Sequence, residues 1–266
     1  MNAATLPARR FDAAGKAHVD LPAILKLAAP LMATNAVQAL LNLTDLWFIG
    51  RLSTDALAAM SAIYWIVSCA ILLFGGVGLA VQTFVAQAFG SRRKARASRA
   101  LWNALWASLA MAPVFLALAY AGPWLISHFR LEPHVQELAL EYWVPRIGGA
   151  FIGLMGWAAM GFFNGISAVR FTMTVVVVTT LTNALFNQLF MFELGMGMKG
   201  SAWGTNVAQL VGVVVALWFF LGGRLAHEYR SRIMWRPRGS VIRAQLVVGL
   251  PIGVMYGADV LGLALS

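Results

Sequence analysis

Long apolar runs separated by short polar segments dominate the sequence. A helix needs about 20 residues to cross the hydrocarbon core of a bilayer. None of these runs alternates apolar with polar residues as a half-buried strand would, and a helix satisfies its own backbone hydrogen bonds in lipid. The pattern therefore predicts an all-α, polytopic transmembrane bundle with seven helices at 22–49, 56–85, 100–121, 138–165, 171–192, 201–222 and 244–265.

The composition supports a membrane protein. Hydrophobic residues make up 60% of the 266 residues and charged residues 11%, whereas a soluble domain carries about 25% charged residues. The net charge of +10 would suggest nucleic-acid binding in a soluble protein. Here the cations lie between the apolar runs, where they set the orientation of a membrane protein. We interpret the basic segments 91–99 and 223–243 as loops beside anionic lipid headgroups, with no nucleic acid as partner.

The distribution of Lys and Arg predicts which end of the bundle faces the cytoplasm. With a cytoplasmic N-terminus, 16 of the 20 cations fall on the inner side, and we assign four to the outer side, namely Arg51, Arg130, Arg146 and Lys199. Cytoplasmic segments carry such an excess, so we expect a multi-pass protein of the bacterial inner membrane. The first run contains Pro30 and lacks a cleavage site, which excludes a signal peptide.

A faint internal repeat predicts how the helices are grouped. The segments AILKLAAPL (23–31) and AQLVVGLPI (244–252) share a pattern that places Pro30 and Pro251 several residues into their helices. Parallel repeats of multi-helix halves are common in secondary transporters. We therefore expect a cytoplasmic tail at 1–21, a six-helix first lobe at 22–222, a basic cytoplasmic linker at 223–243 and the first helix of a truncated second lobe at 244–266.

Polar side chains recur at helical spacing within three of the apolar runs. A charged residue at the bilayer centre costs roughly 2.5–3.5 kcal/mol, so Asp45 in the first run must face protein or water rather than lipid. Three polar stripes predict one hydrated cavity, although hydrogen bonds between helices, worth about 0.6 kcal/mol each, are the simpler alternative. The stripes are Asn35, Gln38, Asn42 and Asp45, then Thr180, Asn183 and Asn187, then Thr205, Asn206 and Gln209.

Reversible protonation is the chemistry that suits Asp45. Burial and amide donors act in opposite directions on a carboxyl group, so their balance permits both protonation states. A neutral Asp45 lets the helix bend at Pro30, whereas a charged one recruits water or a cation. Asp259, eight residues after Pro251, is a second candidate acid, with a hydrogen bond between packed helices as the alternative.

The sequence lacks the residue clusters that several other functional classes require. Cys69 is the single cysteine, and the four histidines are scattered, so we expect no disulfide, metal site, cofactor or enzyme centre. The glycines Gly75, Gly76 and Gly78 lie inside an apolar run. We expect them to permit close contact between helices rather than to form a phosphate-binding loop.

Four motifs together resemble the multidrug and toxic compound extrusion (MATE) transporters, especially their DinF-like branch. The first is LAAPLMATNAVQALLNLTDLWFIGRLSTDALAA, with its proline and an acid fifteen residues later. The others are VAQAFGSRRKARA (85–97), then Tyr142 with Arg146, then NALFNQLFMFELGMGMKGSAWGTNVAQ (183–209). The resemblance covers almost the whole chain from about Leu21.

The resemblance implies a six-helix N-lobe followed by the first helix of a C-lobe, in a monomeric antiporter of twelve helices. Such a protein exports cationic or amphipathic compounds by alternating access in exchange for H⁺ or Na⁺. The resemblance also assigns the N-lobe proton or cation site to Asp45, Asn183, Thr205 and Gln38. From the polar stripes we add Asn187 to this site and expect Asn35, Asn42, Thr180, Asn206 and Gln209 to line the cavity.

Two positions depart from the family pattern. Asn187 stands where DinF-like members often carry Asp, which leaves Asp45 as the only candidate titrating acid of the lobe and weakens the case for Na⁺. Asp259 stands where members of other branches have Glu after the proline of the seventh helix.

Three other functions compete with efflux. The first is a flippase for lipid-linked saccharides from the same superfamily, which needs several cations in its cavity, and we count none within the runs. The second is an intramembrane enzyme, for which no nucleophile or metal cluster is present. The third is a non-functional truncated fragment of a transporter.

Overall fold

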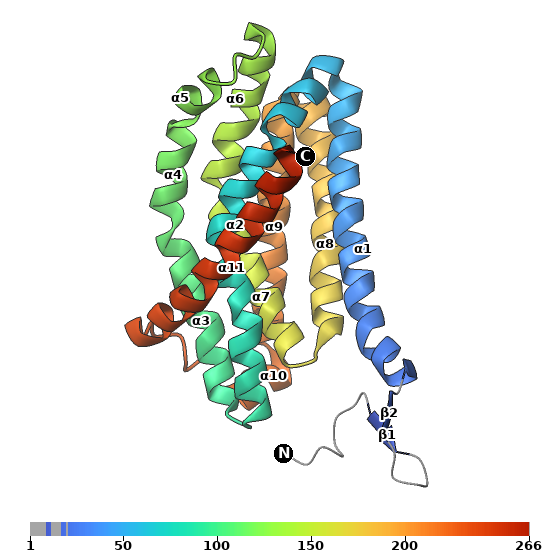
Figure 1. The fold of residues 1–266 in the computed structure, drawn as a ribbon, viewed down its shortest axis with the longest axis vertical. Helices are drawn as coiled ribbons and strands as arrows, with labels where there is room; N and C mark the ends of the chain where they lie inside the picture. The colour runs from blue at the N-terminus through green and yellow to red at the C-terminus, as the bar shows by residue number, and fades with distance from the viewer. Residues whose placement is uncertain (1–8, 12–16, 20, 266) are drawn as a thin grey trace.

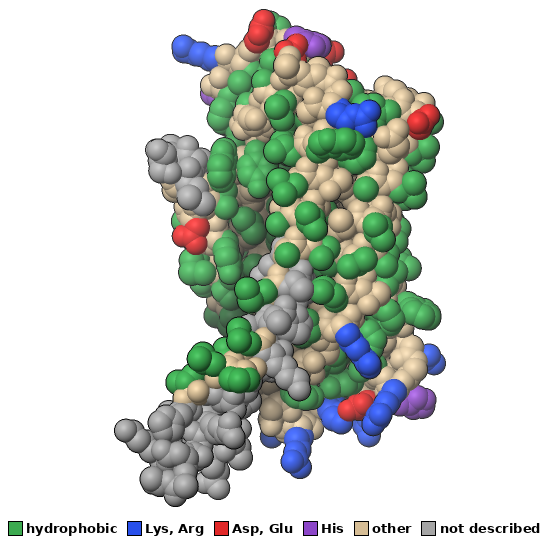
Figure 2. All heavy atoms as spheres, turned by 90° about the vertical axis from the view of Figure 1, so that its right-hand side faces the viewer, with side chains coloured by type: hydrophobic (Ala, Val, Ile, Leu, Met, Phe, Trp, Pro, Cys, Tyr) green, Lys and Arg blue, Asp and Glu red, His purple; other side chains and the backbone are tan. Residues whose placement is uncertain are grey.

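The computed structural model describes residues 9–11, 17–19 and 21–265. Over these residues the chain is a bundle of long helices, with a short β-ribbon at the N-terminal end (Figure 1). The predicted all-α transmembrane class is confirmed. Large apolar side chains such as Leu43, Trp218 and Val247 remain exposed on the outside of the bundle. Figure 2 shows apolar side chains over its middle and most of the charged ones near its ends.

The first two long helices run the length of the bundle. They are α1 (Leu21–Leu52) and α2 (Thr54–Gly90), joined at Ser53. The Ser53 hydroxyl accepts a hydrogen bond from the Ala56 amide at 2.9 Å, which caps α2. The third span begins at Lys94, six residues earlier than predicted, and is broken once, between α3 (Lys94–Ala110) and α4 (Ala112–Tyr120). The short helix α5 (Gly122–Ser127) follows it.

The fourth span is bent in its middle. It comprises α6 (Pro133–Gly148) and α7 (Ala150–Gly165), which meet at an angle of 48°. Pro145 lies in the last turn of α6 and has no backbone N–H to donate, and Gly149 follows it at the junction. Proline and glycine of this kind are ordinary causes of a kink. The bend turns the last residues of α6 toward the centre of the bundle.

The remaining helices complete the bundle. They are α8 (Val169–Asn187) with the π-helical turn η2 (Gln188–Glu193), α9 (Gly197–Leu221), α10 (Gly223–Tyr229) and α11 (Gly239–Leu265). Five segments of the described chain are long and apolar enough to cross a membrane, and the bent α6–α7 pair is a sixth. The 32-residue α1 has the length of a further span.

Two features of the ends were not predicted. Within the expected N-terminal tail, β1 (Arg9–Phe11) pairs antiparallel with β2 (Ala17–Val19). Within the expected linker at 223–243, the short helix α10 packs beneath α9 and α3. These elements are too short for hydrophobic periodicity to reveal them.

Glycines let α11 lie directly against α2. A side chain at Gly76 would collide with the backbone of Gly249 and Gly253, and one at Gly249 would meet the backbone of Val77. Gly249, Gly253 and Gly257 are spaced four residues apart on α11, the small-residue pattern typical of close helix pairs in membranes. The prediction that Gly76 serves helix contact is therefore confirmed, and the diagonal crossing of α11 over α2 is visible in Figure 1.

The α2–α11 contact is testable through the single cysteine. Cys69 Sγ lies 3.9 Å from the Gly257 carbonyl oxygen on α11. We expect Gly76→Leu to push the two backbones apart, at a cost of about 1–3 kcal/mol or more, and to speed maleimide labelling of Cys69 in detergent. Gly90→Leu is the matched control on the same helix, because no atom lies within 4 Å of a side chain there. Equal labelling rates in the two variants would contradict the contact.

Candidate functional site

The Asp45 carboxylate on α1 is held by an amide of α8. Asn187 Nδ2 donates a hydrogen bond of 2.6 Å to Asp45 Oδ1. The two residues are 142 positions apart in the sequence, so the bond joins the first and fifth spans. Asp45 is partly exposed, whereas Asn187 is fully buried. The acid therefore lies at the boundary between the inside of the bundle and the surface of α1.

A chain of polar side chains continues from this bond into the bundle. Asn187 Nδ2 also lies 3.3 Å from Asn183 Oδ1, and Asn183 Nδ2 donates to Thr205 Oγ1 at 3.3 Å. The Thr205 hydroxyl then donates to the Ser201 carbonyl oxygen at 3.0 Å. The chain connects α1, α8 and α9, and it brings together the predicted residues Asp45, Asn183, Asn187 and Thr205.

Local structure explains why the amides reach one another. Asn183 and Asn187 are four residues apart, so they stack on one face of α8. Gly204 on α9 leaves room for Asn187, since a side chain at Gly204 would collide with Asn187 Oδ1. Within the described part of the chain, the buried Asn187 Oδ1 has no hydrogen-bond donor. It is therefore available to accept from a protonated acid or to coordinate a cation.

Arg146 lies inside the bundle, which corrects two statements made from the sequence. Its guanidinium Nη1 is 3.5 Å from Asn206 Oδ1, and it interacts electrostatically with Asp45. Arg146 is therefore not an outer-side cation, and it is a cation within the fourth span. The cause is the bend: Arg146 follows Pro145 at the end of α6, and Asn206 Nδ2 donates to the Pro145 carbonyl oxygen at 2.6 Å.

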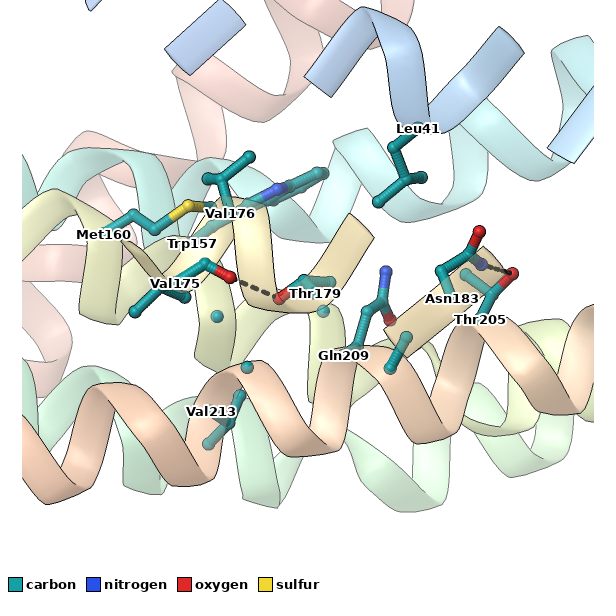
Figure 3. A pocket seen from close by; sticks show the side chains of 14 residues that line it. Leu41, Trp157, Met160, Val175, Val176, Thr179, Asn183, Thr205, Gln209 and Val213 are labelled. Carbon is teal, nitrogen blue, oxygen red and sulfur yellow. Dashed lines mark hydrogen bonds between the residues drawn. The ribbon is translucent and has the colours of Figure 1, made fainter. Parts of the chain in front are cut away.

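A small cavity adjoins the polar chain. It has a volume of about 60 Å³, which is room for a few water molecules. Helices α7, α8 and α9 form most of its wall, and Leu41 of α1 closes one side (Figure 3). Its polar lining comes from Thr179, Asn183, Thr205 and Gln209, and its apolar lining includes Trp157, Met160, Val175, Val176 and Val213. Asn183 and Thr205 belong to both the cavity and the chain from Asp45.

Several predicted lining residues lie elsewhere. Thr180 donates to the Val176 carbonyl oxygen at 2.9 Å and does not line the cavity, because its neighbour Thr179 occupies that face of α8. Asn206 is buried against the α6–α7 bend instead. Asn42 is exposed on α1, where Leu41 faces the cavity. The second candidate acid, Asp259, is exposed on α11 and does not line the cavity.

The other outcomes are mixed. Gln209 lines the small cavity, and its buried Oε1 has no donor among the described residues. The side chains of Gln38 and Asn35 lie outside the described residues. In the sequence-based prediction, Arg146 is an outer cation and part of a family motif but has no place at the site, although its position inside the predicted fourth span was a usable signal.

These features define a class of protein: a polytopic helical membrane protein with an acid–amide site against a polar cavity, as in secondary transporters. A sequence profile of the MatE family matches residues 30–189. The chain therefore belongs to the MATE family of efflux transporters, and the resemblance inferred from the motifs is confirmed. The DinF-like branch and the truncation after the seventh helix stay predictions.

Curated relatives are named as probable multidrug resistance proteins. The protein NorM of Pseudomonas aeruginosa is 29% identical over 250 residues, which cover 91% of this chain and 50% of that protein. The NorM of Thermotoga maritima is 26% identical over 243 residues, covering 87% and 50%. The chain thus spans about half the length of the curated relatives it matches.

Solved structures share the fold. An outward-facing multidrug resistance MATE family transporter of the MOP superfamily is 26% identical, with a TM-score of 0.77 over 88% of this chain and 52% of that one. A MOP superfamily transporter from Pyrococcus furiosus, at 24% identity, has a TM-score of 0.76 over the same shares of the two chains.

The Asp45–Asn187 bond is testable by a double-mutant cycle. We expect Asn187→Leu to lower the free energy of unfolding in mixed detergent by about 1–3 kcal/mol, because the Asp45 carboxylate loses its amide donor. Asp45→Leu combined with Asn187→Leu removes both partners, so the loss in the double variant falls short of the sum of the single losses by more than about 0.5 kcal/mol. Asn42→Leu, one turn earlier on α1 and exposed, is the control. Strict additivity would contradict the bond.

Proposed function

We propose that this chain forms the N-terminal half of a secondary active antiporter that exports cationic or amphipathic compounds in exchange for H⁺. The observation that supports this proposal is the row of side-chain hydrogen bonds from Asp45 through Asn187 and Asn183 to Thr205. It adjoins the cavity between α7, α8 and α9. An intramembrane acid held by buried amides marks an ion or proton pathway by default. We expect no cofactor and no enzymatic reaction.

The Asn187 amide suits an acid that changes its protonation state. Its Nδ2 donates to the Asp45 carboxylate, and its Oδ1 has no donor among the described residues. A rotation of the amide by half a turn presents Oδ1 to a protonated Asp45, so each protonation state finds a partner. Because Asp45 and Asn187 belong to different helices, the change alters how α1 is tied to α8. That supplies a two-state element biased by a proton.

The coupling energy is sufficient for export. One proton moving through 100 mV releases about 2.3 kcal/mol, and each tenfold gradient stores about 1.4 kcal/mol. One proton per substrate therefore supports a gradient of roughly 50-fold. Alternating access requires the site to open to each side in turn, and we propose that protonation of Asp45 biases this exchange.

The charge around Asp45 favours H⁺ over Na⁺ as the coupling ion. Asn187 offers one amide oxygen in place of a second carboxylate, and the Arg146 cation interacts with Asp45. A small metal cation prefers several anionic or carbonyl oxygens, and a neighbouring guanidinium repels it. Proton uptake needs only the carboxyl group. Na⁺ coupling remains the alternative outcome of the experiment below.

Arg146 is also the observation that favours the flippase for lipid-linked saccharides, whose anionic cargo needs cations in the cavity. The charge of this single guanidinium is already compensated by Asp45, and its N–H lies near Asn206 Oδ1. It therefore offers little to an anionic cargo, and the efflux function is the better supported one. For the orientation we propose that the basic end faces the cytoplasm of a bacterial cell, with the bundle in the inner membrane.

We expect Asp45→Asn to abolish H⁺-driven efflux of a cationic dye, because asparagine keeps the shape of the side chain but cannot take up or release a proton. The measurement is dye movement in proteoliposomes of the protein at the full length of its reading frame, after an imposed pH gradient. Asn42→Ala, exposed on the same helix, should retain transport.

Three results would count against the proposal. Unchanged export by Asp45→Asn would remove Asp45 from the mechanism. Transport that depends on a Na⁺ gradient and not on pH would show that the coupling ion is Na⁺ rather than H⁺. Inactivity of the unsubstituted protein toward cationic dyes, with movement of a labelled lipid-linked saccharide, would favour the flippase. Circular dichroism of each variant checks that its helices are intact.

A further inference from the structure

A basic concavity lies at the end of the bundle where α2 turns into α3. It shares no lining residue with the cavity beside Asp45. It forms between the α2–α3 turn and α10 and has a volume of about 400 Å³. Segments more than 130 residues apart meet there, and five of the seven lining side chains are cationic. The lining residues are Arg92, Arg93, Lys94, Ala95, Arg96, Glu228 and Arg230.

The single carboxylate in this concavity is already neutralised. Lys94 Nζ bonds Glu228 Oε1 at 2.5 Å, and Arg224 Nε lies 3.9 Å from Glu228 Oε2. The hydrogen bond from Lys94 lowers the pKa of Glu228, so this carboxyl is ionised at neutral pH and compensates Lys94. The bond also ties the α2–α3 turn to α10, which holds the two walls together.

Four guanidinium groups remain without an acidic partner among the described residues. They belong to Arg92, Arg93, Arg96 and Arg230. The 17-residue helix α3 begins in the same place, and its N-cap residue Arg93 makes no side-chain cap. The Arg96 amide donates to the Arg93 carbonyl oxygen, so the amides of Lys94 and Ala95 are the ones that add donors, together with the positive end of the helix dipole, to the same concavity. Guanidinium groups and free amides of this kind bind phosphate oxygens.

Apolar side chains next to the cations indicate that the phosphate carries acyl chains. Phe89 precedes Arg92 by three residues and is 41% exposed, and Ile233 follows Arg230 by three residues and is 68% exposed. The segment that holds Ile233 is fixed to α3, because Trp102 Nε1 donates to the Ser231 carbonyl oxygen at 2.7 Å. An amphiphile satisfies both parts of this surface, whereas a free phosphate leaves the apolar part in water.

We propose that this concavity is a binding site for the phosphate-bearing headgroup of an anionic phospholipid. The lipid would bridge the α2–α3 turn and α10 across the gap already spanned by Lys94 and Glu228. The site shares no residue with the row of hydrogen-bonded side chains from Asp45 to Thr205 or with the cavity beside it. The inference is therefore independent of the proposed transport function.

The test measures lipid binding to two variants that lose the same charge. We expect Arg93→Gln with Arg96→Gln to weaken binding of phosphatidylglycerol by about 25-fold, since each cation near an anionic headgroup contributes roughly fivefold. Arg236→Gln with Arg243→Gln is the matched control: Arg236 is exposed in the segment after α10, Arg243 is exposed near the start of α11, and neither lines the concavity. We expect less than about twofold weakening there. Native mass spectrometry of the detergent-solubilised protein, titrated with the lipid, gives the dissociation constants.

Further arms separate the lipid from other ligands of similar chemistry. Phosphatidylcholine should bind more weakly than phosphatidylglycerol, and glycerol 1-phosphate should not displace the lipid. Equal losses in the two double variants, equal binding of the two lipids, or displacement by glycerol 1-phosphate would each overturn the proposal. Tighter binding of an RNA oligonucleotide than of the lipid would do so as well.

Discussion

The bond between the Asp45 carboxylate and the Asn187 amide is the interaction on which the interior arrangement depends. A carboxylate within a bilayer-spanning segment needs a polar partner, and Asn187 supplies one at 2.6 Å. Asn187 in turn needs the space left by Gly204 and the neighbouring amide of Asn183. One acid on α1 therefore constrains side chains on α8 and α9, and the cavity lies where these constraints leave room.

The bend between α6 and α7 supplies the second charge of this region. Pro145 cannot complete the helical hydrogen-bond pattern, and Asn206 of α9 bonds its carbonyl oxygen. Arg146 is thereby directed toward Asn206 and Asp45 rather than toward solvent. The interior of the bundle accordingly contains a carboxylate and a guanidinium cation near each other, and their opposite charges reduce the cost of keeping either inside.

Much of the architecture could be predicted because lipid simplifies the problem. Apolar runs of spanning length have one stable solution, and a polar stripe on such a run must face the interior, which is why the contacts of Asp45, Asn183, Asn187 and Thr205 agree with the predicted faces. Gly76 was interpretable for the same reason, since glycine within an apolar run usually serves close packing.

Other details depend on geometry that spacing does not contain. Whether Thr179 or Thr180 faces the cavity is decided by the rotation of α8, and adjacent residues differ by about 100° around the axis. The rotation of α1 likewise decides that Leu41 faces the cavity and that Asn42 is exposed. The inward position of Arg146 depends on the bend that follows Pro145, which the distribution of charge along the sequence does not contain. The two basic segments 91–99 and 223–243 are visible in the sequence, but spacing does not show that residues 92–96 meet Glu228 and Arg230 in one concavity.

The π-helical turn η2 has a consequence for the side-chain register of the fifth span. A π turn accommodates one extra residue, so side chains after it are offset by about one residue's rotation from where a continuous α-helix would place them. Before the turn, Asn183 and Asn187 face α1 and α9; within it, Met191 enters the apolar core, and the Phe192 ring lies 6.1 Å from that of Phe48. The fifth span thus presents both an amide face and an aromatic face to the same neighbour, α1. In a relative without the inserted residue, a continuous α-helix could direct only one of these two faces toward α1.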